Sequence, residues 1–321
     1  MAVYTHVPAE ALAALLSRYD VGTLVSAKGI AEGVENSNYL VETSSGRFIL
    51  TLYEKRVAAG DLPFFLALLD HLAAAGRPVP PALPDREGRM IQEVEGRPAC
   101  LIRFLPGVSL TTPTPAQARA AATEMGRMHR ALEGFPLTRP NTLGMESWAP
   151  LLDRCGRHLE EIAPGLHDQI ARGLDTVMAA WDGYRGQPTA VIHADLFPDN
   201  VLMLGATVTG FIDFYFACTD LRLYDLAVMH TAWSFDPAGT HYRGEIGRAL
   251  LDGYRAGFGL SREECRQLRI LCMGACIRFA LTRAWDWLNT PADALVTRKD
   301  PLAYTRRLQH YQQSGSFSFD V

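Results

Sequence analysis

Residues 191–200 read Val-Ile-His-Ala-Asp-Leu-Phe-Pro-Asp-Asn, and residues 210–214 read Gly-Phe-Ile-Asp-Phe. The apolar run at 190–192 is typical of a strand, and it delivers a polar loop that carries His193, Asp195 and Asn200. Residues 201–212 then predict a hairpin that returns Asp213 to the side of this loop. Phosphoryl transfer requires a carboxylate that accepts a proton, with an Asn and an Asp that hold Mg²⁺ on the phosphates of a nucleotide.

The pattern His-x-Asp-x-x-x-x-Asn followed by Ile-Asp-Phe resembles the catalytic and metal loops of the aminoglycoside-phosphotransferase-like and choline-kinase-like small-molecule kinases. Residues 28–39, 49–56 and 212–218 further resemble the bacterial homoserine kinases of this superfamily. The resemblance implies an α+β, bilobal protein-kinase-like fold with ATP between the lobes. Residues 1–103 would form an N-lobe with an antiparallel sheet and one long helix, and residues 104–321 a mostly helical C-lobe.

The resemblance also implies an activity, namely ATP- and Mg²⁺-dependent phosphorylation of the L-homoserine hydroxyl to O-phospho-L-homoserine, a step in threonine biosynthesis. Asp195 would be the catalytic base, and Asn200 and Asp213 would be the Mg²⁺ ligands. His193 would brace the loop, and Asp225 would accept backbone N–H groups from it. The alternative for Asp225 is an acidic residue that serves only the N-terminus of its own helix.

The nucleotide is expected to contact a polar, glycine-bearing loop at 29–38, because such a loop can lay backbone N–H groups over phosphates. Backbone groups at the interlobe hinge would meet the adenine. An ordinary hairpin connection and a plain strand end are the alternatives for these two segments. The expected nucleotide-binding residues are Gly33, Asn36, Ser37 and Asn38 in the loop, Lys55 after the next strand, and Arg103, Phe104 and Leu105 at the hinge.

One position departs from the family pattern. Many members carry a lysine on the strand after the phosphate loop, where this sequence has Thr51. Lys55 lies on the same side of that strand but about 13 Å further along. The positive charge on the α- and β-phosphates is therefore expected from Lys55, from Lys28 or from backbone groups alone.

The acceptor pocket needs a cation and a hydrogen-bond acceptor beside Asp195, because homoserine is a small zwitterion. Arg283 and Asp286 share a face of the predicted helix at 262–288 and could grip the two ends of the amino acid, or simply pair with each other. Tyr215 and Trp233 are candidate walls of the pocket. His129 is interpreted as a core or interlobe histidine bonded to backbone.

Composition and periodicity bound the remaining possibilities. A formal net charge of −4 gives no reason to expect nucleic acid or an anionic membrane as a partner. The N-terminus lacks the basic start and apolar core of a signal peptide, and scattered cysteines are typical of reduced thiols, so we expect a cytoplasmic protein. Beyond the hinge, apolar periodicity predicts helices from residue 115 and over 148–162, 167–181, 220–233, 242–258 and 262–288.

Other functions remain possible from the sequence. The first is a kinase of the same superfamily for choline, methylthioribose or an aminoglycoside. The second is a catalytically silent nucleotide-binding pseudokinase, which Thr51 favours and the intact Asp195, Asn200 and Asp213 disfavour. A metal-dependent hydrolase built on His193, Asp195 and Asp213 is the third, and it would need more histidine ligands than this stretch offers.

Overall fold

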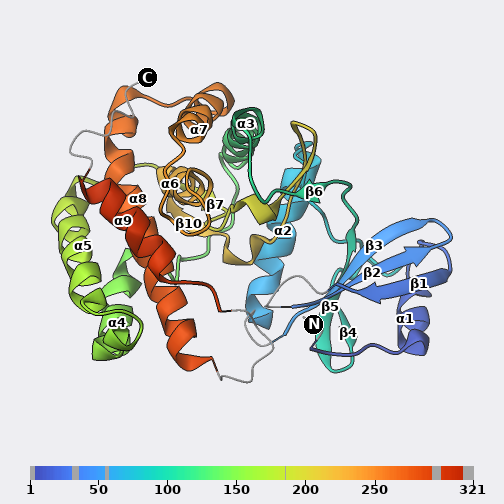
Figure 1. The fold of residues 1–321 in the computed structure, drawn as a ribbon. Helices are drawn as coiled ribbons and strands as arrows, with labels where there is room; N and C mark the ends of the chain where they lie inside the picture. The colour runs from blue at the N-terminus through green and yellow to red at the C-terminus, as the bar shows by residue number, and fades with distance from the viewer. Residues whose placement is uncertain (1–3, 31–35, 55–57, 185, 291–297, 314–321) are drawn as a thin grey trace. The chain divides into compact units, whose positions relative to one another are not determined.

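The computed structural model describes residues 4–30, 36–54, 58–184, 186–290 and 298–313. The chain divides into two compact units, Met1–Pro106 and Gly107–Val321 (Figure 1). Each unit has its own sheet or sheets and its own helices, so each is described by itself.

The first unit is built on a five-stranded antiparallel sheet with the strand order β1-β2-β3-β5-β4 (Figure 1). Tyr39 and Val41 alternate with more exposed residues along β2 and join the leucines of α1 in one apolar core. The elements are α1 (Ala9–Leu16), β1 (Leu24–Gly29), β2 (Ser37–Thr43), β3 (Gly46–Leu52), η1 (Ala59–Asp61), α2 (Leu62–Ala74), β4 (Gln92–Val94) and β5 (Arg97–Arg103).

The second unit is mostly helical and contains two small sheets. The helices are α3 (Pro115–Ala131), α4 (Met145–Cys155), α5 (Leu166–Trp181), α6 (Arg222–Trp233), α7 (Gly244–Gly257), α8 (Arg262–Asn289) and α9 (Leu302–Gln313), with 3-10 turns η2 (Gly156–Glu161), η3 (Asp182–Tyr184), η4 (Pro198–Asn200) and η5 (Phe214–Phe216). The strands are β6 (Val108–Ser109), β7 (Thr189–Ile192), β8 (Val201–Leu204), β9 (Thr207–Phe211) and β10 (Cys218–Leu221). Every residue of α6 is buried, and this helix is enclosed by α3, α7 and α8 (Figure 1).

The hairpin predicted over 201–212 is present as β8 and β9, and β6 adds a third strand beside β8. One expectation about a neighbouring segment was wrong, and one helix further along the chain was not predicted. Residues 218–221 form β10, which pairs antiparallel with β7, whereas a helix was expected from residue 220. Helix α9 was not predicted, although the residues that it buries include Tyr304, Leu308 and Tyr311 at the spacing of one helical face.

All six cysteines are buried and free. Among the helices of the described ranges, none combines the length and the apolar character that a membrane span requires.

Candidate active site

The polar loop after β7 is held in a strained conformation. Ala194 has a φ of 62°, in the left-handed region that residues other than glycine rarely adopt. Such a conformation costs about 1–3 kcal/mol and persists only where the surrounding structure enforces it. Both backbone groups of Ala194 are hydrogen-bonded: its N–H donates to Oδ1 of Asp225 at 2.7 Å, and its carbonyl oxygen accepts from Nη1 of Arg278 at 2.5 Å.

Asp225, in the first turn of α6, is fully buried beneath the loop. Its Oδ2 accepts the N–H of His193 at 2.9 Å, in addition to the Ala194 bond at Oδ1. Burial alone would raise the pKa of this carboxyl group, but hydrogen bonds from His129 and from the backbone of His193 bring the pKa below its usual value. The carboxylate therefore accepts two consecutive backbone N–H groups of the loop in its ionised form.

His193 joins the loop to the segment that carries Asp213. Its Nε2 donates to the carbonyl oxygen of Ile212 at 2.9 Å, and its Nδ1 accepts the N–H of Asp195 at 3.3 Å. Burial lowers the pKa of this imidazole, so it is neutral, as this arrangement of donors and acceptors requires. Because both ring nitrogens are engaged, His193 has no lone pair for a metal, which argues against the hydrolase alternative.

Asp195 and Asn200 lie side by side on the loop. Nδ2 of Asn200 donates to the carbonyl oxygen of Asp195 at 2.8 Å and approaches its Oδ2 at 3.4 Å. Burial raises the pKa of Asp195 to about 8, with a further rise from the Asp213 carboxylate, whereas the positive charges of Arg278 and Lys299 oppose that rise. Asp195 is therefore a half-buried carboxylate with a pKa near physiological pH.

Asp213 follows β9 and is tied to the loop through its neighbour. The N–H of Ile212 donates to the carbonyl oxygen of Asn200 at 3.1 Å, which places residues 200 and 213 at the same end of the hairpin. Asp213 has a φ of 65°, a conformation that Asp tolerates better than most residues. The structure thus brings Asp195, Asn200 and Asp213 together.

The donor set of Asn200 and Asp213 fits a hard divalent cation. Because Nδ2 of Asn200 faces Asp195, its Oδ1 points to the other side of the amide, and Asp213 adds carboxylate oxygens. Within the described ranges, no group of three or more His, Cys, Asp or Glu side chains is arranged to hold a metal ion. These two ligands suit Mg²⁺, which commonly takes one or two protein oxygens and completes its octahedron with water and phosphate.

Arg278 of α8 was noted from the sequence only as a charge embedded among apolar residues, and its bond to the loop was not predicted. Its side chain is buried, bonded to Ala194, and packed with its guanidinium carbon 4.6 Å from the centre of the Phe279 ring. The available signal was a lone arginine inside the otherwise apolar run 270–281. A buried cation in such a run needs an anionic or carbonyl partner, and here the partner is the strained loop.

The four candidate acceptor-binding residues lie in different surroundings. Arg283 is half-buried, with its guanidinium carbon 4.6 Å from the centre of the Tyr304 ring, and the charge of Asp195 acts on it. Asp286 is exposed, and Tyr215 is half-buried in η5. Trp233 is a correction: it lies in the core, 1% exposed, and its Nε1 donates to the carbonyl oxygen of Leu196 at 2.9 Å. It supports the loop from below instead of lining an accessible wall.

His129 is buried, as expected, but its partners are not backbone groups. Its Nε2 lies 2.9 Å from Oδ2 of Asp225, and its Nδ1 lies 2.9 Å from the hydroxyl oxygen of Tyr254. The histidine therefore supports the polar loop at 193–200, the candidate catalytic loop, through Asp225.

In the first unit, the expected phosphate-loop residues are only partly available. Gly33 and Lys55 lie outside the described residues. The side chain of Ser37 is buried, and its hydroxyl donates to Glu54 and accepts the N–H groups of Tyr4 and Thr5, so a contact of Ser37 with a phosphate through its backbone remains a prediction. Its hydroxyl holds the N-terminal segment and is not available to a phosphate.

Asn36 and Asn38 also make contacts within the unit. The Oδ1 of Asn36 accepts the N–H of Glu54 at 3.3 Å, and Oδ1 of Asn38 accepts the hydroxyl of Thr51 at 2.7 Å. Thr51 is buried and lies opposite both Asn38 and Cys100 in the sheet. The position where many family members are expected to carry a lysine therefore holds a hydroxyl that is bonded to the neighbouring strand.

The expected hinge residues lie at the end of β5. The N–H of Arg103 donates to the carbonyl oxygen of Pro81 at 3.1 Å, so this backbone donor is already used. Phe104 is half-buried, and the guanidinium carbon of Arg47 lies 4.6 Å from its ring centre. Leu105 is half-buried as well. Contact of Phe104 and Leu105 with adenine remains a prediction.

Comparison with known proteins identifies the family of the chain and several similar proteins. The sequence model of the phosphotransferase enzyme family matches residues 26–260. The chain belongs to the phosphotransferase enzyme family. A homoserine kinase of Gluconobacter oxydans strain 621H is 50% identical over 315 residues, which cover 98% of this chain and 99% of that protein. A homoserine kinase of Acidiphilium cryptum strain JF-5 is 51% identical over 316 residues and 98% of each chain.

Solved structures of phosphotransferases share the fold. A spectinomycin phosphotransferase in complex with ADP and spectinomycin has a TM-score of 0.68 at 13% identity, over 95% of each chain. An amicoumacin kinase in complex with AMP-PNP and Ca²⁺ has a TM-score of 0.67 at 16% identity, over 94% of each chain. At these identities the likeness shows the fold alone, and it confirms the bilobal protein-kinase-like class expected from the sequence.

Because the Thr51 hydroxyl is bonded to Asn38, removing it should hardly affect the nucleotide. We expect Thr51→Ala to change the KM for ATP by less than about threefold, the size of one ordinary hydrogen bond or less. Lys28 is exposed on β1. If it supplies the positive charge that many family members are expected to carry at the position of residue 51, Lys28→Ala should raise the KM for ATP. Steady-state kinetics with ATP as the varied substrate measures both, and a tenfold rise for Thr51→Ala would contradict the assignment.

Proposed function

We propose that this chain is an ATP-dependent kinase that phosphorylates the side-chain hydroxyl of L-homoserine, with Mg²⁺ as the metal ion and O-phospho-L-homoserine as the product. The observation that carries the proposal is the strained loop that presents Asp195 beside Asn200 and Asp213. This loop is held by hydrogen bonds from Ala194 to Asp225 and Arg278. The choice of acceptor is supported by identity of about one half, over 98% of the chain, to proteins named homoserine kinase.

In this proposal Asp195 orients the acceptor hydroxyl and takes its proton late in the transfer. A general base works best when its pKa lies near the operating pH, and burial raises the pKa of Asp195 to about 8. Asn200 and Asp213 would hold Mg²⁺, which neutralises charge on the phosphates when it is bound. The neutral His193 and the ionised Asp225 fix the loop and exchange no protons with the substrate.

The acceptor pocket of the proposal contains Arg283 as the partner of the homoserine carboxylate. Its guanidinium is half-buried against Tyr304 and close enough to Asp195 for their charges to interact. A guanidinium can bind a carboxylate through two parallel hydrogen bonds. Asp286 is exposed, so the joint grip by Arg283 and Asp286 is reduced to Arg283 alone.

The acceptor assignment predicts a substrate ranking. With ATP and Mg²⁺, L-homoserine at equal concentration should give faster ADP release than choline, methylthioribose or kanamycin. Arg283→Ala should raise the KM for homoserine at least about tenfold, the size of one charge-assisted hydrogen bond, and leave the KM for ATP unchanged. Arg266→Ala, an exposed residue on the same helix that pairs with Glu263, is the control and should change neither constant.

Phosphorylation of choline, methylthioribose or kanamycin with none of homoserine would contradict the acceptor and leave the kinase activity in place. No nucleotide turnover with any acceptor would favour the pseudokinase. An unchanged homoserine KM in Arg283→Ala would remove the carboxylate contact from the proposal.

A further inference from the structure

A row of buried polar side chains runs from the surface of the second unit to the catalytic loop. Arg222, at the start of α6, forms an ion pair with Glu264 and donates from Nη1 to the hydroxyl oxygen of Tyr254 at 2.5 Å. That hydroxyl lies 2.9 Å from Nδ1 of His129, whose Nε2 lies 2.9 Å from Asp225. Asp225 in turn holds the N–H groups of residues 193 and 194.

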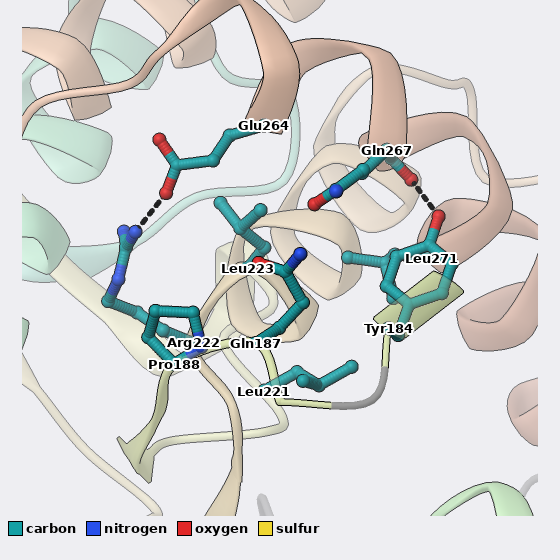
Figure 2. A pocket seen from close by; sticks show the side chains of 9 residues that line it. All are labelled: Tyr184, Gln187, Pro188, Leu221, Arg222, Leu223, Glu264, Gln267 and Leu271. Atoms are coloured by element: carbon teal, nitrogen blue, oxygen red, sulfur yellow. Dashed lines mark hydrogen bonds and ion pairs between the residues drawn. The ribbon is translucent and has the colours of Figure 1, made fainter. Parts of the chain in front are cut away.

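The outer end of this row is fixed by further contacts. At the outer end, one oxygen of Glu264 binds Arg222 and the other accepts the N–H of Ser261 at 2.8 Å, in the capping box that begins α8. Figure 2 shows Arg222 and Glu264 meeting at the rim of a small pocket. The guanidinium carbon of Arg222 also lies 4.1 Å from the centre of the Phe258 ring.

Close helix packing brings the middle of the row together. Tyr254 is on α7 and His129 is on α3, and these helices approach through glycines. A Cβ at Gly253 or Gly257 of α7 would come within 2.2 Å of a backbone carbonyl oxygen of α3. Tyr254 and His129 are consequently enclosed, with exposed fractions of 0% and 1%.

The hydrogen-bonding capacities of these groups set the direction of every bond. Arginine only donates hydrogen bonds and an ionised carboxylate only accepts them, so Arg222 donates a hydrogen bond to Tyr254 and His129 Nε2 donates one to Asp225. Within the described residues, the Tyr254 hydroxyl has Arg222 and His129 as its hydrogen-bond partners. Its own proton therefore belongs on the bond to Nδ1, which makes His129 a neutral imidazole protonated at Nε2. The opposite arrangement would leave the tyrosine proton without an acceptor.

We propose that Arg222 and Tyr254 are positioning residues that hold His129 in its Nε2-protonated tautomer and thereby fix Asp225 beneath the catalytic loop. The inference rests on the proposed kinase function only for its effect on turnover. The tautomer itself is a property of the protein without substrate.

The direct test is ¹⁵N NMR of histidine-labelled protein, with the His129 signals assigned by their loss in His129→Gln. In the wild type we expect one protonated nitrogen, Nε2, and an unprotonated Nδ1 that accepts a hydrogen bond. Tyr254→Phe removes a single oxygen and should shift the Nδ1 signal or mix the tautomers. Arg222→Met should do the same because it frees the hydroxyl to turn, whereas Arg222→Lys, which keeps a donor, should restore the wild-type signals.

The matched control is Tyr184→Phe. Tyr184 is also buried, and its hydroxyl donates to the carbonyl oxygen of Gln267 on the other side of the same pocket, away from the row (Figure 2). This variant should leave the His129 signals unchanged. A doubly protonated His129 in the wild type, or unchanged Nδ1 signals in Tyr254→Phe, would overturn the proposal whatever the kinetics show.

Turnover gives the second readout. Tyr254→Phe should lower kcat about five- to tenfold, the effect of one lost hydrogen bond on the loop, with the KM values for ATP and acceptor nearly unchanged. Tyr184→Phe should change kcat less than twofold. Equal kcat values in these two variants would overturn the link to the loop. If homoserine were not a substrate but the NMR result held, the proposed function would fail and the tautomer assignment would stand.

Discussion

Asp195→Asn and Asp195→Ala should lower kcat by at least about 100-fold, because a positioned general base contributes 10²-fold or more. The dissociation constant of Mg²⁺-ATP should stay within about threefold of wild type, since the proposed metal ligands are Asn200 and Asp213. The Asn variant keeps the volume of the side chain beside Nδ2 of Asn200. Rapid-quench kinetics and calorimetric ATP titration measure the two quantities separately.

The matched control is Asp199→Asn. Asp199 lies on the same loop and is exposed, so the substitution removes the same charge without touching the loop's supports. It should retain most of the wild-type rate. If Asp195→Ala kept more than about a tenth of that rate, Asp195 would not be the general base.

Arg278→Met should produce the second large effect, a fall in kcat of about 10- to 100-fold. The substitution removes the donor on the Ala194 carbonyl and the positive charge that opposes the rise in the pKa of Asp195. A buried hydrogen bond from a charged group contributes about 1.5–3 kcal/mol, which corresponds to this range of rates. Arg278→Lys keeps the charge and should recover part of the loss.

Arg269→Met is the control for this substitution. Arg269 lies on the same helix and also donates to a backbone carbonyl, that of Tyr311 at 3.1 Å, but it does not reach the catalytic loop. The two variants should have similar melting temperatures and very different kcat values. A kcat for Arg278→Met within threefold of wild type, in a folded protein, would show that Asp225 alone can hold Ala194.

The parts of the site that are close in sequence could be predicted, and the parts that are distant could not. Asp195 and Asn200 are five residues apart on one loop, and a predicted hairpin returns Asp213 to it, so spacing alone indicated the group. Ala194 and Arg278 are 84 residues apart, and His129 and Tyr254 are 125 apart. No local pattern connects residues at such separations without the helix packing that brings them together.

The surroundings of two side chains could not be predicted from the sequence. Ser37 lies in a polar loop, and its hydroxyl accepts N–H groups of the N-terminal segment, so only its backbone is left for the predicted phosphate contact. Trp233 was expected at a pocket wall because it is aromatic, but α6 is buried on all sides, and the indole N–H donates to the carbonyl oxygen of Leu196 in the loop. In both cases the residue type was compatible with two environments, and only the tertiary structure distinguishes them.

The central claim, transfer of a phosphoryl group from ATP to the hydroxyl of L-homoserine, is tested most directly by ³¹P NMR of the reaction products. With enzyme, ATP, Mg²⁺ and homoserine, we expect ADP and an equal amount of a phosphomonoester whose phosphorus couples to the side-chain CH₂ protons of the amino acid. The same mixture with Asp195→Asn should show neither product on that time scale. Formation of ADP with inorganic phosphate alone, or of no product with the wild-type enzyme, would contradict the account.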